Sequence, residues 1–136
     1  YSDIIKDNFN FISKNKFPNS YEVMQNYKYT FSSFSTMAKE NLARGNRTGF
    51  LMYKPNSDQA SILRMGYGNF EKLGKKGPFW SSMKKFELTE VERVFNFVLR
   101  GKENEWKKIK PRYINPVLEF DQNNKKFFKI LKTIDD

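Results

Sequence analysis

The chain has 136 residues, and 25 Lys and Arg against 15 Asp and Glu leave a formal net charge of +10 at pH 7. It contains no Cys and no His, which excludes disulfides, thiol nucleophiles, histidine bases and Cys- or His-based metal sites. The positive charge favours an anionic partner, which could be nucleic acid, an acidic protein or a membrane surface. A basic chain that is merely soluble remains an open alternative.

The length predicts one domain with a core of its own, and no apolar run is long enough for a transmembrane helix. The first residue is Tyr rather than Met, so we expect an N-terminal piece to be missing, either a targeting peptide or a trimmed end. Together with the basic, Cys-free composition, this predicts a mitochondrial location.

Residues 1–45 predict an N-terminal helical extension of two helices. The first covers residues 2–15 and is broken at Phe17-Pro18-Asn19. The second begins at Ser20 and ends at Gly45. Apolar residues recur at helical spacing in both, at Ile4, Ile5, Phe9 and Ile12 in the first and at Met24, Tyr27, Phe31, Phe34, Ala38 and Leu42 in the second.

Residues 46–136 predict a sheet with one helix, which makes the expected fold class α+β. Strands at 48–54 and 60–67 flank a turn-forming segment and predict a hairpin. Residues 78–88 predict a third strand. Residues 113–120 and 125–133 flank Asp121-Gln122-Asn123-Asn124 and predict a second hairpin. We therefore expect an antiparallel sheet of about five strands.

A capped helix follows the third strand. Thr89 and Glu92 have the spacing of a capping box, and Arg100 suits the negative end of the helix dipole. Gly101 is expected to end the helix in a left-handed conformation. One apolar face is predicted from Val91, Val94, Phe95, Val98 and Leu99. A short charged helix over 102–110 should then stop at Pro111.

The sequence offers little for catalysis. Gly66-Tyr67-Gly68 lacks the third glycine of a dinucleotide loop, because Glu71 stands in its place, and residues 74–77 lack the Gly-Lys-Ser/Thr ending of a phosphate loop. The acids are scattered, so we predict no enzyme activity, no cofactor and no metal site. A divalent ion held by carboxylates alone remains open.

Cations and aromatic residues alternate between residues 64 and 86, and Glu71 is the only acid before Phe86. Cations on a sheet can track phosphates, and exposed rings can stack on bases. The predicted phosphate contacts are Arg64, Lys72, Lys75, Lys76, Lys84 and Lys85, and the predicted base contacts are among Tyr67, Phe70 and Trp80. The open alternative is that the rings lie in the core while the lysines only solubilise the chain.

Part of this segment resembles the Whirly family and its relatives, the mitochondrial guide-RNA-binding and Pur-type proteins. Trp80-Ser81, Phe86, Leu88, Thr89 and Glu92 follow the spacing W-S-x4-F-x-L-T-x2-E, which is similar to the strand-to-helix junction of the Whirly repeat. The predicted hairpin at 117–131 is similar to the strand pair after that family's first helix. The resemblance covers residues 48–133 and implies a curved antiparallel sheet that binds single-stranded nucleic acid, often as an oligomer in an organelle.

The sequence therefore predicts a non-enzymatic protein that binds single-stranded nucleic acid, with RNA as the expected form. The alternative is a structural accessory subunit of a large organellar assembly, such as a mitochondrial ribosome or a respiratory complex, with protein partners on the same surfaces.

Overall fold

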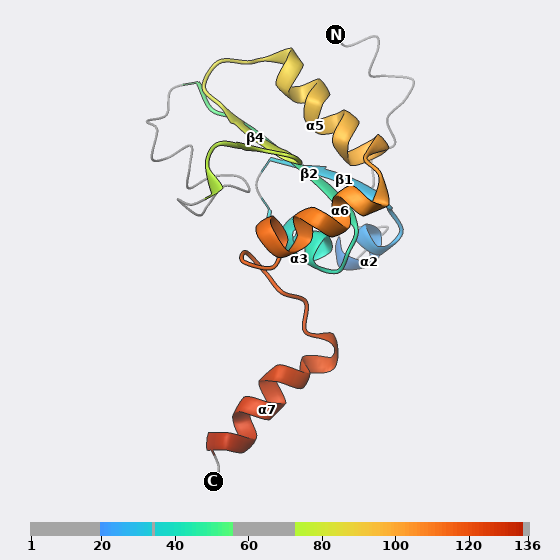
Figure 1. The fold of residues 1–136 in the computed structure, drawn as a ribbon, viewed down its shortest axis with the longest axis vertical. Coiled ribbons are helices and arrows are strands. Elements are labelled where there is room, and N and C mark those ends of the chain that lie inside the picture. Colours follow the sequence, from blue (N-terminus) through green and yellow to red (C-terminus); the bar gives the residue numbers. More distant parts are fainter. Residues whose placement is uncertain (1–19, 34, 56–72, 135–136) are drawn as a thin grey trace.

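The computed structural model describes residues 20–33, 35–55 and 73–134. These residues form a body of mixed helix and sheet, from which the C-terminal helix stands away (Figure 1). In chain order the elements are α2 (Ser20–Gln25), β1 (Tyr29–Ser32), α3 (Thr36–Ala43), β2 (Arg47–Tyr53), β3 (Lys76–Gly77), β4 (Trp80–Met83), α5 (Leu88–Arg100), α6 (Glu103–Ile109), a π-helical turn (Lys110–Ile114), a 3-10 turn (Gln122–Asn124) and α7 (Lys125–Ile134).

The sheet in the described residues has four strands in the order β1-β2-β4-β3. β1 pairs with β2 in parallel and β2 pairs with β4 in parallel, whereas β3 and β4 are antiparallel. The expected antiparallel sheet is therefore wrong for most of the strand pairs described. The reason is connectivity: α3 carries the chain from the end of β1 back to the start of β2, and such a crossover joins parallel strands.

Helices cover both faces of the sheet (Figure 1). Successive residues of β2 point to opposite faces, and their contacts identify the two sides. The amide of Asn41 on α3 donates to the hydroxyl of Thr48 at 3.4 Å. A Cβ on Gly49, the next residue, would lie 3.1 Å from a methyl group of Val98 on α5. Thus α3 packs on one face and α5 on the other.

The segment that predicted one long helix from Ser20 to Gly45 contains β1 between two shorter helices, so that prediction is wrong. Tyr29, Thr30 and Phe31 are β-formers, and their side chains alternate between the two faces. The Thr30 hydroxyl lies 2.8 Å from that of Thr48, while the Phe31 ring stacks on Phe95 of α5 with centroids 3.9 Å apart. The predicted division at residue 45 falls inside this β1-α3-β2 unit.

The core lies on both sides of β2 and β4. Phe50, Phe79, Trp80, Val94 and Val98 are fully buried. Trp106 of α6 stacks on Phe79, with ring centroids 5.6 Å apart. These buried side chains hold α5 and α6 against the sheet, mainly through the removal of apolar area from water.

The helix predicted after the third strand is confirmed as α5, but its ends differ from the prediction. Glu87, not Thr89, is the N-cap residue, and no side chain caps it. Gly101 has φ −54° and ψ 137°, so it is not left-handed. Glycine is needed there for another reason, because a Cβ would lie 2.4 Å from the carbonyl oxygen of Phe97.

The C-terminal part differs most from the prediction. Pro111 does not stop the helix but lies inside the π-helical turn that continues α6. The second predicted hairpin is wrong, because residues 125–134 form α7. Phe127, Ile130, Leu131 and Ile134 are spaced by threes and fours, which is the helical period, and this outweighs the short alternation of Phe128 with Ile130.

Two predicted elements lie outside the described residues. These are the helix over 2–15 and the strand over 60–67, which was to complete the first hairpin. Its other strand, predicted at 48–54, is confirmed as β2.

Candidate functional site

The carboxyl ends of β2 and β4 lie side by side and form the candidate site. The register pairs Tyr53 with Met83, and the amide of Lys54 donates to the carbonyl of Met83 at 3.0 Å. Tyr53-Lys54 and Lys84-Lys85-Phe86 therefore leave the sheet together. In open sheets of parallel strands with helices on both faces, ligands bind outside the carboxyl ends of the strands.

We call Tyr53, Lys54, Lys84, Lys85 and Phe86 the carboxyl-edge surface. All five residues are exposed. The rings of Tyr53 and Phe86 meet edge to face, with centroids 6.1 Å apart and planes at 82°. Half of Tyr53 and 56% of Phe86 remain accessible, so the pair presents aromatic surface in two segments that also carry three exposed lysines.

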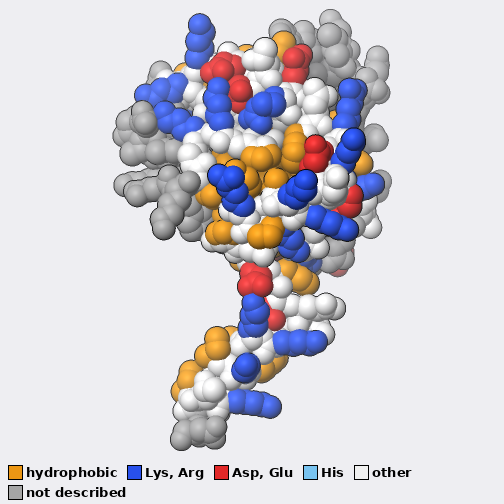
Figure 2. Space-filling model, viewed as in Figure 1, with side chains coloured by type: hydrophobic (Ala, Val, Ile, Leu, Met, Phe, Trp, Pro, Cys, Tyr) orange, Lys and Arg blue, Asp and Glu red, His pale blue; other side chains and the backbone are white. Residues whose placement is uncertain are grey.

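Other cations reinforce the positive charge here. The carbonyl of Lys75 accepts from the amide of Ser82 at 2.9 Å, which places Lys75 across β4 from β2. Figure 2 shows several Lys and Arg side chains at this end of the body, and others spread over the rest of the visible face. The arrangement suits an anion, because several cations at one edge raise the local concentration of anionic ligands.

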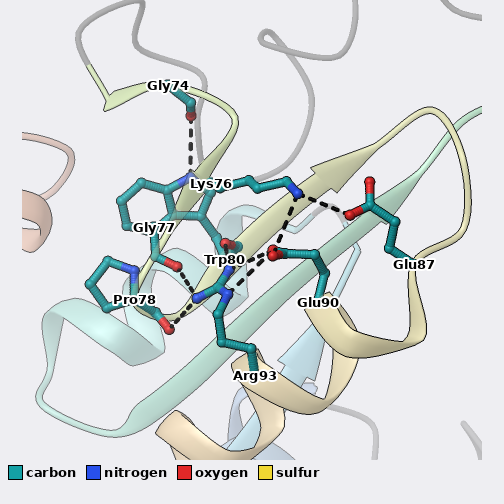
Figure 3. A network of polar contacts seen from close by, with 8 residues as sticks. All are labelled: Gly74, Lys76, Gly77, Pro78, Trp80, Glu87, Glu90 and Arg93. Carbon is teal, nitrogen blue, oxygen red and sulfur yellow. Dashed lines mark hydrogen bonds and ion pairs between the residues drawn. The ribbon is translucent and has the colours of Figure 1, made fainter.

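Lys76 belongs to a different structure, a network that joins β3 to α5 (Figure 3). Its ammonium lies 3.1 Å from Glu87 and 3.4 Å from Glu90. The hydrogen bond to Glu87 raises the pKa of Lys76. This lysine is held by two carboxylates and is poorly placed to meet a phosphate.

Arg93 is the centre of the same network (Figure 3). Its guanidinium donates to the carbonyls of Gly77 at 2.7 Å, Pro78 at 3.3 Å and Trp80 at 3.1 Å. It also pairs with Glu90 at 2.9 Å, and this hydrogen bond holds the pKa of Glu90 below its ordinary value. The network ties the β3–β4 turn to α5 and has a structural role.

Trp80 is the predicted base contact that the structure places in the core. It is 1% exposed, and its indole N–H donates to the carbonyl of Gly74 at 3.2 Å. Its ring meets Tyr113 edge to face, with centroids 5.2 Å apart. A base cannot stack on a ring that is enclosed on both faces, so the prediction of Trp80 as a nucleic-acid contact is wrong.

The remaining predicted contacts divide into two groups. Lys84 and Lys85 come together at the carboxyl edge, with Lys75 across β4. Four others lie outside the described residues, namely Arg64, Tyr67, Phe70 and Lys72.

A sequence model of one protein family matches residues 1–135 of the chain; that family is described as "putative O-antigen biosynthesis protein". The chain belongs to this family. No curated protein and no solved structure matches it. For this family member, the site must be interpreted from its own geometry.

Sequence reasoning missed Tyr53 and Lys54 as site residues and left Phe86 out of the predicted contacts. A signal for them was present, because Tyr53-Lys54 and Lys84-Lys85-Phe86 each lie at the carboxyl end of a strand. That signal becomes useful only if the two strands are parallel neighbours, since only then do both segments lie at the same edge.

Within residues 20–33, 35–55 and 73–134, no group of three or more Asp and Glu residues is placed to hold a metal ion. In the same ranges, none of the helices combines the length and the apolar character that crossing a bilayer requires.

Proposed function

We propose that this chain is a binding module in O-antigen biosynthesis, and that its carboxyl-edge surface binds a nucleoside phosphate. The observation that supports this most directly is the junction of β2 and β4, where Tyr53 and Phe86 meet beside Lys54, Lys84 and Lys85. Ammonium groups suit the phosphates, and the exposed rings suit the planar base. The description of the family supplies the process.

The extent of the surface favours a single nucleotide unit over a nucleic-acid strand. Protein grooves for single strands combine a positively charged track with several stacking rings. Among the described residues this surface offers two exposed rings, Tyr53 and Phe86, and Trp80, which was expected to extend the stacking surface, is buried. Nucleotides beyond the first would therefore add little to the affinity of single-stranded nucleic acid.

The proposed role is binding rather than catalysis. Glu87, which directly follows Phe86 in the chain, is paired with Lys76, and Glu90 on α5 is paired with Lys76 and Arg93. The hydrogen bond from Arg93 lowers the pKa of Glu90, and a lowered pKa makes a carboxylate a weaker base.

Calorimetric titration with uridine diphosphate tests the proposal. We expect the diphosphate to bind, with uridine and inorganic pyrophosphate each binding more weakly because each lacks one half of the recognised group. Replacing Phe86 by Leu should weaken the binding of uridine diphosphate about tenfold, since base–aromatic stacking contributes roughly 1–3 kcal/mol. The same change should leave the binding of pyrophosphate unchanged.

Charge reversal tests the lysines. The double variant Lys84→Glu with Lys85→Glu should bind uridine diphosphate about tenfold more weakly, or weaker still. This loss of affinity should shrink as salt is raised, because exposed charges are screened. The matched control is Lys107→Glu with Lys108→Glu, which makes the same change in net charge on exposed residues of α6. Equal losses of affinity in the two double variants would show that only the net charge matters and would contradict the proposed site.

A single-stranded oligouridine series separates this proposal from strand binding. If the carboxyl-edge surface takes one nucleotide unit, affinity per binding site should not rise with oligonucleotide length. Affinity that rises steeply with length would instead support the single-stranded nucleic-acid function predicted from the sequence. If uridine diphosphate shows no heat and no shift in thermal stability, the nucleoside phosphate site is wrong.

A further inference from the structure

Helix α7 is amphipathic, and it stands outside the body of the protein (Figure 1). None of its residues is buried. Phe127, Phe128, Ile130, Leu131 and Ile134 are between 39% and 71% exposed. A helix of this length is marginal in water without a surface to pack on, so the apolar residues of α7 require an explanation.

The charges on α7 are all of one sign. Its polar residues are Lys125, Lys126, Lys129, Lys132 and Thr133, and it contains no acid. Two aspartates follow in the sequence, at positions 135 and 136, outside the described residues. At about 100° per residue the four lysines fall within about one third of the helix circumference. Figure 2 shows the Lys side chains along one side of α7 and apolar side chains mainly along the other.

The lysines also border the apolar face on both sides. On the helical wheel Lys126 is next to Ile130 on one flank, and Lys132 is next to Phe128 on the other. A second copy of α7 packed on this face would bring lysines against lysines, with no acid in the helix to pair with them, and like charges oppose such pairing. An anionic surface would meet the same lysines favourably.

The start of α7 is held by the chain before it. The carboxylate of Asp121 accepts from the amides of Lys126 at 2.9 Å and Phe127 at 3.3 Å. The ammonium of Lys126 pairs with Glu119 at 2.5 Å. These contacts preform the first turn, so the helix is ready to bind, and Lys125, Lys129 and Lys132 are the lysines left to meet a partner.

We propose that α7 is a membrane-surface helix, which inserts its apolar face into the interface of an anionic phospholipid bilayer and places its lysines at the headgroups. A lysine-rich polar face opposite a face with Phe and Leu is the pattern of helices that lie in the interface plane. Each lysine near an anionic surface adds an attraction equivalent to about fivefold in partitioning. The inference is independent of the nucleoside phosphate site.

Vesicle flotation of the whole 136-residue chain tests the inference. We expect the chain to bind vesicles of phosphatidylcholine mixed with phosphatidylglycerol, and to bind pure phosphatidylcholine vesicles far more weakly. Because the chain has a net charge of +10, attraction to anionic vesicles alone does not identify α7, and the decisive measurements are made on paired variants.

The charge pair is Lys129→Gln with Lys132→Gln, compared with Lys107→Gln with Lys108→Gln on α6. Both double variants lose two positive charges at exposed positions. The α7 pair should weaken partitioning by about 25-fold, at about fivefold for each lysine, whereas the α6 pair should change it by about twofold or less. Equal effects would overturn the inference.

The apolar pair is Phe127→Ser with Ile130→Ser, compared with Leu99→Ser on α5, which is 42% exposed. The α7 pair should weaken partitioning by at least about tenfold through lost apolar burial, with the midpoint of thermal unfolding unchanged, because α7 contributes nothing to the core. The inference is overturned if the α7 double variant binds vesicles as strongly as wild type does. It is also overturned if wild type forms a dimer without vesicles and the double variant is a monomer. In either case α7 contacts something other than lipid.

Discussion

The side chain of Arg93 on α5 binds the main chain of Trp80 on β4, because the guanidinium of Arg93 donates to the carbonyl of Trp80 at 3.1 Å. The same guanidinium also reaches the carbonyls of Gly77 and Pro78 and the carboxylate of Glu90. One side chain thus satisfies acceptors from a turn, a strand and its own helix. It positions the strand from which Lys84, Lys85 and Phe86 emerge.

Replacing Arg93 by Ala should destabilise the fold by about 2–3 kcal/mol, because hydrogen bonds to a charged group contribute about 1.5–3 kcal/mol each and the partial exposure of this side chain lowers their sum. Urea denaturation measures the change. Arg100→Ala, at an exposed position in the last turn of the same helix, should cost about 0.5 kcal/mol or less. Similar losses for the two variants would show that Arg93 acts only as a surface charge.

Glu90 should make stability depend on pH. The hydrogen bond from Arg93 lowers its pKa in the folded protein, so its contribution is fully present above the ordinary glutamate pKa of about 4.3. The contribution is lost as pH falls through the lower folded pKa. Urea denaturation of Glu90→Gln across this range should therefore give less stability than wild type at neutral pH and should converge with wild type in acid. Glu92→Gln, exposed on the same helix, is the control, and parallel curves for wild type and Glu90→Gln would contradict the prediction.

Trp80→Ala should destabilise by about 3–5 kcal/mol, since it removes a fully buried indole and leaves a cavity. Its hydrogen bond to the Gly74 carbonyl would be lost as well. Thermal unfolding followed by circular dichroism gives the measurement, with Tyr27→Ala, at a half-exposed ring, as the comparison. A Trp80→Ala protein as stable as the Tyr27→Ala protein would place the indole outside the core.

Gly77→Ala should also destabilise, through overpacking. A Cβ at this position would lie within 2.1 Å of three carbons of the Trp80 ring, and Gly77 is the register partner of Trp80 in the β3–β4 pair. We expect a cost of about 1–3 kcal/mol. The diagnostic measurement is a double-mutant cycle, in which the same change made in a Trp80→Leu protein should cost less because the ring is gone. An equal cost in both proteins would mean that the ring is not what excludes a side chain at position 77.

Several parts of this fold could be predicted from local pattern. The apolar residues of α5 repeat at helical spacing, and Val94 and Val98 are fully buried as that pattern indicates. The strand at 48–54 is confirmed as β2. The cationic pair Lys84-Lys85 was correctly expected to be exposed. These features depend on residues that are close in sequence.

Other parts could not be predicted because competing patterns were equally short. Residues 127–131 contain both an alternation, Phe128 and Ile130, and a helical spacing, Phe127, Ile130 and Leu131. Period alone does not decide between strand and helix over so few residues. The ends of α5 show the same limit, since Thr89 and Gly101 are residue types that suit caps, but the helix begins one residue earlier than Thr89, after Glu87, and Gly101 is not left-handed.

The amino-acid sequence by itself determined the positive charge, the absence of Cys and His chemistry, and the periodic faces of the long elements, because these depend on residue type and on spacings of a few residues. Only the tertiary structure decided that β2 and β4 run in parallel, that Trp80 faces inward, and that Tyr53 and Lys54 lie beside Lys84, Lys85 and Phe86. The direction and register of a strand depend on the path of the long segment that connects it to its neighbour. They also depend on the apolar side chains that each face of the strand can bury. That information lies in contacts between segments far apart in the chain.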